Sequence, residues 1–557
     1  MSSNRRSIRR AVGVALPVAL ALVPVGVARA ASPPVAPVNT YTPYDTTTST
    51  GEPSIGYDPL RNVVLYGAGT KNKRLTFDDS TVPATVGIAD ASATTSVTSL
   101  DAITFVDQHT GRTFVSQLAA ATSLFSYSND AGKNYTPSQG SGAGAVLDHQ
   151  TVGGGPFHAG TLPSGIGVYP DAVYYCAQNS YNGGCAVSPD GGLTFNTAVP
   201  AYNSAANDPN DPNTTFAGEG GACSALHGHL RVGPDGTAYL PVKGCGGTAT
   251  TANLTNTEFA GGHPSVSVST DNGTTWTVHR VDAGANPDES DPSVAVGRGD
   301  ATAGKGRAYL GWEDGVNTPV DTGYGTTSEA KIATSTDGGQ TFSTPVDVSS
   351  ALGIQNVQFP EVIAGDDDRA AFAWLGTTSA GDDQHNPGTT TGGVAAIPAS
   401  AVWHLYVSTT YDGGKTYTTV DTTPTVPVQR GCIDLQGTSN KTVQDSNICS
   451  TRNLLDFNDI TVDGQGRALV AYTQGCTGAC VAGPSTPSNS KSSADFVMRQ
   501  TTGLGLYAAD DGQIGVPSAG PTAALPETPY PAALLAGAAG TVWLVVRRRR
   551  RTDRLAE

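Results

Sequence analysis

The sequence has little of what a helical protein needs. Only 2 of its 557 residues are Met and charged residues make up 14%, whereas 68 residues are Gly. Helix formers are therefore sparse, and glycine at this level is typical of chains with many tight turns. This composition excludes a mainly helical fold. We expect an all-β protein, a class in which a single domain can be long.

Basic residues are also scarce once the two ends of the chain are set apart. The terminal segments hold 11 of the 32 basic and 2 of the 48 acidic residues, so the region between them carries 21 basic and 46 acidic residues. Its net charge is about −25. Such a surface repels nucleic acids and anionic membranes, so we expect neither as a partner of this region.

The N-terminal segment has the three parts of an export signal. Four arginines precede an apolar stretch over residues 11–27, and a small-x-small cleavage site ends at Ala30. The paired arginines leave both the general secretory and the twin-arginine routes open. We predict a signal peptide over residues 1–30, followed by an extended linker over residues 31–50 that is rich in Pro and Thr.

The C-terminal end has the order of a surface anchor. A predicted linker (506–528) ends in Leu525-Pro-Glu-Thr528, an apolar segment follows (529–546), and the chain closes with a basic tail (547–557). Apolar-then-basic order keeps a tail on the cytoplasmic side of a membrane. The motif resembles a Gram-positive cell-wall sorting signal, with Pro529 in place of the glycine. We expect an exported protein anchored to the membrane or cell wall of a Gram-positive bacterium.

Eight cysteines fit the oxidising compartment to which this signal leads. Because they occur as close neighbours along the chain, we predict that each bonds the next. The expected pairs are Cys176–Cys185, Cys223–Cys245, Cys432–Cys449 and Cys476–Cys480.

One octapeptide pattern, S-x-D-x-G-x-[TN]-[WFY], recurs along the chain. Its clearest copy is Ser269-Thr-Asp-Asn-Gly-Thr-Thr-Trp276, and the others begin at Ser128, Ser188, Ser335 and Thr410. In each copy the Asp can accept hydrogen bonds from the backbone of its own turn, the Gly can adopt positive φ, and the aromatic residue can anchor the next strand. Copies spaced roughly 60–80 residues apart indicate a repeat array.

This pattern resembles the Asp-box of the sialidase-like BNR-repeat β-propellers. The resemblance implies a propeller in which each box joins the third and fourth strands of a blade. A β-rich segment that fits a second strand also recurs seven times, at 61–66, 111–115, 171–175, 236–240, 306–310, 368–372 and 466–470. We predict seven four-stranded blades over residues 51–505, with six blades, the number in sialidases, as the alternative.

Polar residues stand at the start of each predicted first strand, the strand that lines the channel of a propeller. We expect them to converge at one mouth of this channel, where a glycosidase would need two carboxyl groups. The catalytic candidates are Asp148, His149, Asp291, Glu361, Asp456 and Asp459. The binding candidates at the same level are Glu52, Asp101, His227, His229 and Asn458.

A sialidase, as the resemblance implies, holds its substrate carboxylate with three arginines and uses a Tyr nucleophile helped by a Glu, with an Asp as the acid. The family's Arg-Ile-Pro stretch is absent, and Glu52-Pro-Ser-Ile55 stands in that region. The remaining candidates for such a clamp are Arg231, Arg430 and Arg452.

No cofactor is expected. The alternatives are a metal bound by the three channel histidines with Asp148, and Ca²⁺ at the Asp-rich loops 207–212 and 365–368. Two functions remain open. One is a monomeric sialidase-like hydrolase of extracellular glycans or glycoproteins, and the other is a non-catalytic glycan- or protein-binding propeller of the adhesin type.

Overall fold

The protein is described by a computed structural model. The described residues are 38–517, apart from the internal segments 95–101, 120–121, 141–147, 160–168, 179–181, 204–221, 224–225, 248–262, 282–286, 289, 316–325, 392, 436–448, 450–451 and 484–491. The predicted signal peptide, apolar C-terminal segment and basic tail lie outside these residues. In the described part, no helix is long and apolar enough to cross a membrane.

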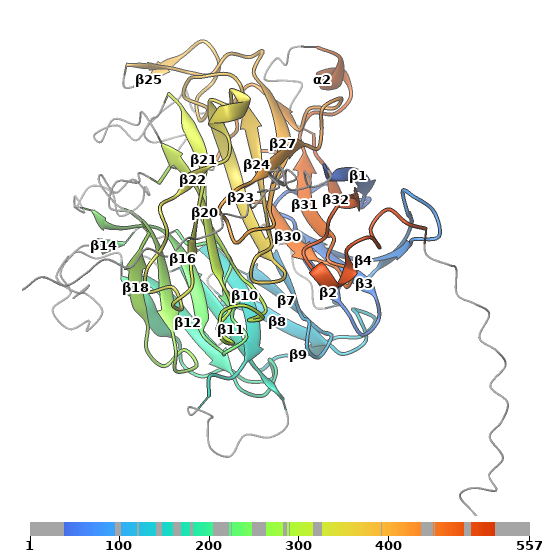
Figure 1. Ribbon diagram of the computed structural model, residues 1–557, viewed down its shortest axis with the longest axis vertical. Coiled ribbons are helices and arrows are strands. Elements are labelled where there is room, and N and C mark those ends of the chain that lie inside the picture. The colour runs from blue at the N-terminus through green and yellow to red at the C-terminus, as the bar shows by residue number, and fades with distance from the viewer. Residues whose placement is uncertain are drawn as a thin grey trace, which may run out of the picture. The chain divides into compact units, whose positions relative to one another are not determined.

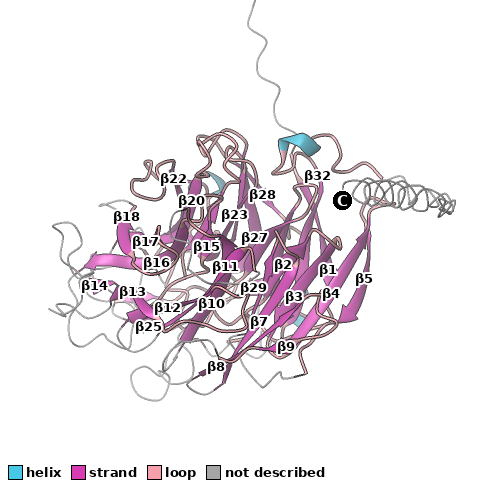
Figure 2. Cartoon of the chain, turned by 90° about the horizontal axis from the view of Figure 1, so that it is seen from below, coloured by secondary structure: helices cyan, strands magenta, loops and turns pink. Residues whose placement is uncertain are grey.

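The chain forms a seven-bladed β-propeller, which confirms the predicted fold and the larger of the two blade numbers (Figure 1). Each blade is an antiparallel sheet, and the first strands of consecutive blades contact one another around the central channel. Strands make up nearly all of the regular structure in Figure 2. The helical segments in the described part are the short α2 (Ala479–Ala482), η2 (Ser350–Leu352) and η3 (Ala508–Asp510).

The first four blades follow one another along the chain, each built from the channel outward. Blade 1 contains β2 (Ser54–Asp58), β3 (Val63–Ala68), β4 (Lys71–Asp78) and β5 (Thr85–Asp90). Blade 2 contains β6 (Ala102–Asp107), β7 (Arg112–Ala119), β8 (Thr122–Ser128) and β9 (Thr136–Pro137). Blade 3 contains β10 (Asp148–Pro156), β11 (Asp171–Gln178), β12 (Asn182–Ser188) and β13 (Val199–Asn203). Blade 4 contains β14 (Ala222–Cys223) and β15 (Arg231–Val232), which both pair with β16 (Ala238–Gly247), then β17 (His263–Ser269) and β18 (Thr277–Arg280).

The last three blades complete the ring. Blade 5 contains β19 (Ser293–Val296), β20 (Ala308–Gly315), β21 (Ser328–Ser335) and β22 (Val346–Asp347). Blade 6 contains β23 (Asn356–Ala364), β24 (Ala370–Thr377), β27 (Val402–Thr410) and β28 (Thr418–Asp421), with β29 (Gln429–Arg430) on β27 and the small hairpin of β25 (Thr390–Thr391) and β26 (Val394–Ala395) in a loop. Blade 7 contains β30 (Asp459–Val462), β31 (Ala468–Gln474) and β32 (Ala494–Thr502).

The fourth strand of blade 7 comes from the other end of the chain. Strand β1 (Thr40–Asp45) pairs antiparallel with β32, beside which it lies in Figure 1. Hydroxyl pairs add to this ladder, for example Thr42 Oγ1 and Thr501 Oγ1 at 2.7 Å. The predicted linker over residues 31–50 therefore contains a strand. Nothing in the sequence indicated this strand, for two reasons. Its composition is rich in Pro and Thr, and its partner β32 lies about 450 residues further along the chain.

The predicted turns occupy the predicted place, between the third and fourth strands of five blades. In the copy between β17 and β18, Ser269 Oγ accepts the N–H of Gly273 at 2.9 Å, and Asp271 Oδ1 accepts the N–H of Thr275 at 2.9 Å. Gly273 has φ of 75°, and a Cβ there would lie 3.1 Å from the ring of Tyr174 in the preceding blade. The turn glycine thus serves both the turn and the packing between blades.

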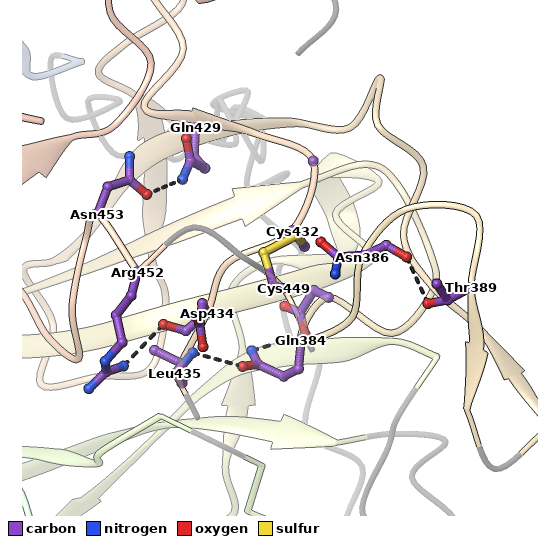
Figure 3. The surroundings of a disulfide bond; sticks show 12 residues. Gln384, Asn386, Thr389, Gln429, Cys432, Asp434, Leu435, Cys449, Arg452 and Asn453 are labelled. Carbon is purple, nitrogen blue, oxygen red and sulfur yellow. Dashed lines mark hydrogen bonds between the residues drawn. A yellow bond between two sulfur atoms is a disulfide. The ribbon is translucent and has the colours of Figure 1, made fainter. Parts of the chain in front are cut away.

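All four predicted disulfides are present, and every cysteine is bonded. Disulfides of this number are typical of proteins from an oxidising compartment. Figure 3 shows the Cys432–Cys449 bond, around which Gln384 Oε1 accepts the N–H of Leu435 at 3.0 Å. The bond therefore closes a loop within the connection from β29 to β30, and hydrogen bonds from Leu435 and Cys449 to Gln384 hold this loop on blade 6.

Candidate functional site

A repeated contact between neighbouring blades defines one level of the channel. Near the start of a first strand, a side chain accepts the backbone N–H of the next blade's first strand. The four contacts are Ser54 Oγ to Thr104 N, Thr151 Oγ1 to Leu230 N, Ser293 Oγ to Val362 N and Asp459 Oδ2 to Ile55 N. By this correspondence, equivalent positions in the seven blades hold Ser54, Ile103, Thr151, His229, Ser293, Glu361 and Asp459.

Three of these equivalent residues form a buried cluster. His229, Glu361 and Asp459 come from blades 4, 6 and 7, and one ligand-type atom of each lies within 4.8 Å of the others. They are 6%, 2% and 4% exposed. Ser293 Oγ donates to Glu361 Oε2 at 2.9 Å, and Arg231 lies beside Asp459 with its Nη2 3.2 Å from Oδ1. We call these three residues the channel cluster.

The channel cluster drives the pKa values of its two carboxyl groups apart. Burial raises the pKa of Glu361 to about 8, and the charge of Asp459 raises it while His229 and Arg231 oppose the change. Burial also disfavours the charged form of Asp459, but His229, Arg231 and the Ile55 amide outweigh it and lower the pKa of this residue. At neutral pH, Glu361 therefore carries a proton and Asp459 does not.

A cavity of about 320 Å³ begins at this cluster. His229 and Asp459 line its inner end together with Arg231. The walls of the cavity are formed by residues of the first strands that follow the cluster level along the chain. The cavity then extends past the carboxyl ends of these strands, where Arg298 and Tyr507 line it. A concave site with few polar groups among apolar walls is the usual form of a small-molecule site.

The predicted mouth residues lie on the other side of this level and are buried. Glu52 is 1% exposed, and Asn458 is 2% exposed. His227 Nδ1 donates its hydrogen to the carbonyl of Gly228 at 3.1 Å, and burial lowers the pKa of His227 to about 4, so it is neutral. These three residues are buried and do not line the cavity, so their place at an open mouth of the channel stays a prediction.

The remaining candidates from the first strands fall into two groups. His149 Nδ1 is bonded to Asp291 Oδ2 at 2.9 Å, and His149 has φ of 48° at an irregularity of β10. This pair is separate from the channel cluster. Asp148 belongs to β10, although its side chain is outside the described part, as is the whole of Asp101.

The three candidate arginines do not form a common clamp. Arg430 Nε donates to the carbonyl of Cys480 at 2.9 Å. Arg452 forms a bidentate pair with Asp456. It also donates to the carbonyl of Asp434 at 3.1 Å, a bond that Figure 3 shows. Of these three arginines, only Arg231 lines the cavity. Asp456 is thereby the partner of Arg452 rather than a member of the channel cluster.

The predicted metal groups are not brought together as expected. His149 and His229 have different carboxylate partners, Asp291 and Asp459. The channel cluster has the right residue types for a metal, but the oxygens of Asp459 already accept N–H donors from Ile55, Ile460 and Arg231. Because its oxygens already accept these hydrogen bonds, Asp459 is better suited to remain a hydrogen-bonded anion than to bind a metal.

In the described Asp-rich loop, 365–368, two of the three carboxylates are already bonded. Asp366 pairs with Arg298 at 2.5 Å, and Asp367 accepts the backbone N–H groups of Gly299 and Ala301. These bonds join blades 5 and 6. The other loop, 207–212, lies outside the described residues.

Sequence reasoning missed three residues that the geometry brings to the site. Ser293 follows Asp291-Pro292 and contacts Glu361, but a serine in a strand gives no signal of its own. Arg298 and Tyr507 also line the cavity, and Tyr507 belongs to a segment predicted as a linker. The residue that bonds the next blade recurs once per blade. An alignment of the seven repeats on this position is the one signal that could have identified Ser293.

Comparisons with known proteins do not identify a family for this chain. No family model and no curated protein matches the chain. A protein of unknown function from Dyadobacter fermentans is similar in structure at 14% identity, with 84% of this chain and 98% of that chain covered and a TM-score of 0.36. An α-L-arabinanase from Penicillium chrysogenum matches at 11% identity, with coverages of 85% and 98% and a TM-score of 0.36.

An intramolecular trans-sialidase from Ruminococcus gnavus is similar at 11% identity, with 82% of this chain and 96% of that chain covered and a TM-score of 0.32. Because all three TM-scores are below 0.5, these similarities carry no argument about activity. The function must be argued from the site.

Proposed function

We propose that the protein is a glycoside hydrolase whose reaction centre is the channel cluster. The observation that carries the proposal is the Glu361–Asp459 pair. An oxygen of each carboxyl group lies within 4.8 Å of the other, and Asp459 lines the end of the cavity while Glu361 lies buried directly behind it. The surroundings protonate Glu361 and ionise Asp459. Glycosidases use such a pair, one member as the acid and the other as the carboxylate.

In this proposal, Glu361 donates its proton to the glycosidic oxygen while the bond from this oxygen to the anomeric carbon breaks. The short separation of the carboxyl groups favours attack of Asp459 on the anomeric carbon, since a water molecule between them requires a wider gap. Water, deprotonated by Glu361, then releases the sugar. Such a reaction retains the anomeric configuration.

His229 and Arg231 would hold Asp459 as the anion. Arg231 lies 3.2 Å from Asp459 Oδ1 and His229 Nδ1 lies 3.4 Å from the same oxygen. Burial disfavours the charged imidazole, but the Asp459 charge outweighs it and raises the pKa of His229. Two positive groups next to one carboxylate keep it ionised inside the protein.

The test is hydrolysis of a panel of aryl glycosides and oligosaccharides, including sialosides, by the purified protein. Glu361→Gln and Asp459→Asn should each lower kcat by about 10²–10⁴-fold on any substrate found, the usual loss when a proton-transfer or covalent group is removed. Asp456→Asn is the matched control, because this carboxylate pairs with Arg452 outside the cavity. The proposal fails if the panel is not cleaved, or if Glu361→Gln keeps full activity.

A non-catalytic glycan-binding propeller is the second candidate. The hydrogen bonds to Asp459 favour this candidate. A carboxylate held by Ile55, Ile460 and Arg231 can form part of the wall of a binding cavity without taking part in a reaction. Oligosaccharide binding without hydrolysis of the panel would establish this function. Anchoring at the surface of a Gram-positive cell, expected from the ends of the sequence, would suit either function.

A further inference from the structure

The segment that follows blade 7 returns to the channel. Residues 503–516, here called the strap, lie beyond β32 and were predicted to belong mostly to a linker. Leu506 donates its N–H to the carbonyl of Gly466 at 2.7 Å and accepts the N–H of Asp366 at 2.8 Å. The strap is therefore bonded to blades 6 and 7 at once, through its backbone.

Side chains secure the strap further along. Arg369 forms a bidentate pair with Asp511, at 2.7 and 2.8 Å, and also donates to the carbonyl of Gly505 at 2.9 Å. Asp366 Oδ2 accepts the N–H of Ala508 at 2.7 Å. A bidentate guanidinium–carboxylate pair fixes geometry as well as adding energy. Side-chain bonds from Arg369 and Asp366 therefore hold the strap on blade 6.

The propeller is shaped to receive it. A Cβ atom at Gly365 would lie 2.2 Å from the carbonyl oxygen of Leu506, and one at Gly466 would lie 2.6 Å from the backbone nitrogen of Tyr507. Both approaches are closer than any real side chain permits. The two glycines thus let the strap backbone lie directly on the loops of blades 6 and 7.

This contact places one strap side chain at the cavity. Tyr507 lines the cavity, and the guanidinium of Arg298 lies over its ring, 4.9 Å from the centroid. Arg298 is bonded to Asp366 at 2.5 Å, and half of its side chain is exposed. A ring and a guanidinium held together in this way present an apolar surface next to several N–H donors.

We infer that Tyr507 and Arg298 form an outer sugar-binding subsite, so that the strap is part of the glycan site. The inference rests on the proposed function, because the channel cluster must mark the reaction centre at the inner end. The outer end then receives the sugar on the leaving-group side of the bond. The apolar face of this sugar would contact the part of the half-buried Tyr507 ring that Arg298 leaves uncovered, and its hydroxyl groups would accept hydrogen bonds from Arg298.

Two substrates of the same sugar separate this subsite from the reaction centre. One is the oligosaccharide of the panel that is cleaved fastest, and the other is the glycosyl fluoride of its terminal sugar, which has no sugar on the leaving-group side. Tyr507→Ala should lower kcat/KM for the oligosaccharide about tenfold, the effect of losing one good contact, and leave the fluoride within about twofold. Tyr507→Phe should behave as the unaltered protein.

The matched control is Tyr411→Phe. The hydroxyl of Tyr411 donates to the carbonyl of Leu504 in the strap at 2.8 Å, but the residue does not line the cavity. This variant should leave both substrates unchanged. Equal losses on both substrates in Tyr507→Ala, or no loss on either, would overturn the inference and leave the proposed hydrolase intact.

Binding provides the readout if nothing in the panel is cleaved. The protein and its Tyr507→Ala variant are then compared on an oligosaccharide array. Binding that is lost in the variant would retain the subsite and reject the hydrolase. Binding that the variant keeps would overturn the subsite, and an array with no bound oligosaccharide would overturn both proposals.

Discussion

Asp459 Oδ2 accepts the backbone N–H of Ile55 at 2.8 Å, which ties the first strand of the last blade to that of the first. The same carboxylate contacts His229 and Arg231 across the channel through Oδ1. One side chain thus belongs both to the closure of the ring and to the channel cluster. Its structural and chemical roles have to be separated by choice of variant.

Asparagine and alanine at position 459 should have different effects on stability. Asn retains an oxygen that can accept the Ile55 N–H, whereas Ala leaves a buried donor unpaired, which costs roughly 1–3 kcal/mol. We expect Asp459→Ala to lower the free energy of unfolding by this amount and Asp459→Asn to lower it less, although both variants should lose about 10²–10⁴-fold in kcat if the proposed function is correct. Chemical denaturation measures this difference, and equal stability of the Ala variant and the unaltered protein would contradict it.

The activity should decrease above about pH 8. Burial raises the pKa of Glu361 to about this value, and a general acid works only in its protonated form. Since the pKa of Asp459 is lowered, its ionised form is retained through neutral pH, so kcat/KM should be level there and fall as Glu361 loses its proton. A pH profile of kcat/KM on the best substrate tests this sign. Activity that rises through pH 8 would assign the proton-donor role to another group.

The repeats explain how much of the fold could be predicted. Each Asp-box is a local structure in which Ser, Asp and Gly act within a few residues, so its turn and its place in the blade follow from the sequence. The disulfides also join cysteines near in sequence. The pairing of β1 with β32 depends on residues at opposite ends of the described chain, and no local pattern encodes it.

The candidate site was predictable in part for the same reason. Glu361 and Asp459 could be found as acids at the start of first strands. Whether two acidic side chains lie close together depends on their orientation in the channel, which the sequence does not give. Asp456, for example, pairs with Arg452 and not with the channel cluster. Tyr507 could not be found, because its position depends on the strap and on two glycines of other blades.

Removal of residues 40–45 should open the propeller. These residues form the outer strand of blade 7, and without them β32 becomes an exposed edge with unpaired backbone groups. We expect a protein that lacks them to unfold at a clearly lower temperature and to aggregate, whereas deletion of residues 1–37 should leave the unfolding temperature unchanged. Thermal unfolding of the two truncated forms, followed by circular dichroism, makes the comparison. Equal unfolding temperatures would show that β1 does not close the ring in solution.

The Asp-box carboxylates should make the propeller sensitive to acid. In the turn of blade 2, burial raises the pKa of Asp130, but hydrogen bonds from Asn134, Ser128 and Lys133 together outweigh it and lower the pKa to about 2. An unfolded Asp has a pKa of about 3.9, so the stabilisation by Asp130 is complete above that value and is lost as the pH falls towards 2. The pKa values of Asp190, Asp271, Asp337 and Asp412 are lowered by equivalent bonds.

Asp130→Asn separates this effect from general acid unfolding, because Asn keeps an acceptor oxygen but does not titrate. The variant should be less stable than the unaltered protein at pH 5, and the difference should shrink between pH 4 and pH 2. Unfolding temperatures measured across this range decide the matter. Parallel curves for the two proteins would mean that Asp130 does not contribute through its charge, and the turn would then owe its stability to hydrogen-bond geometry alone.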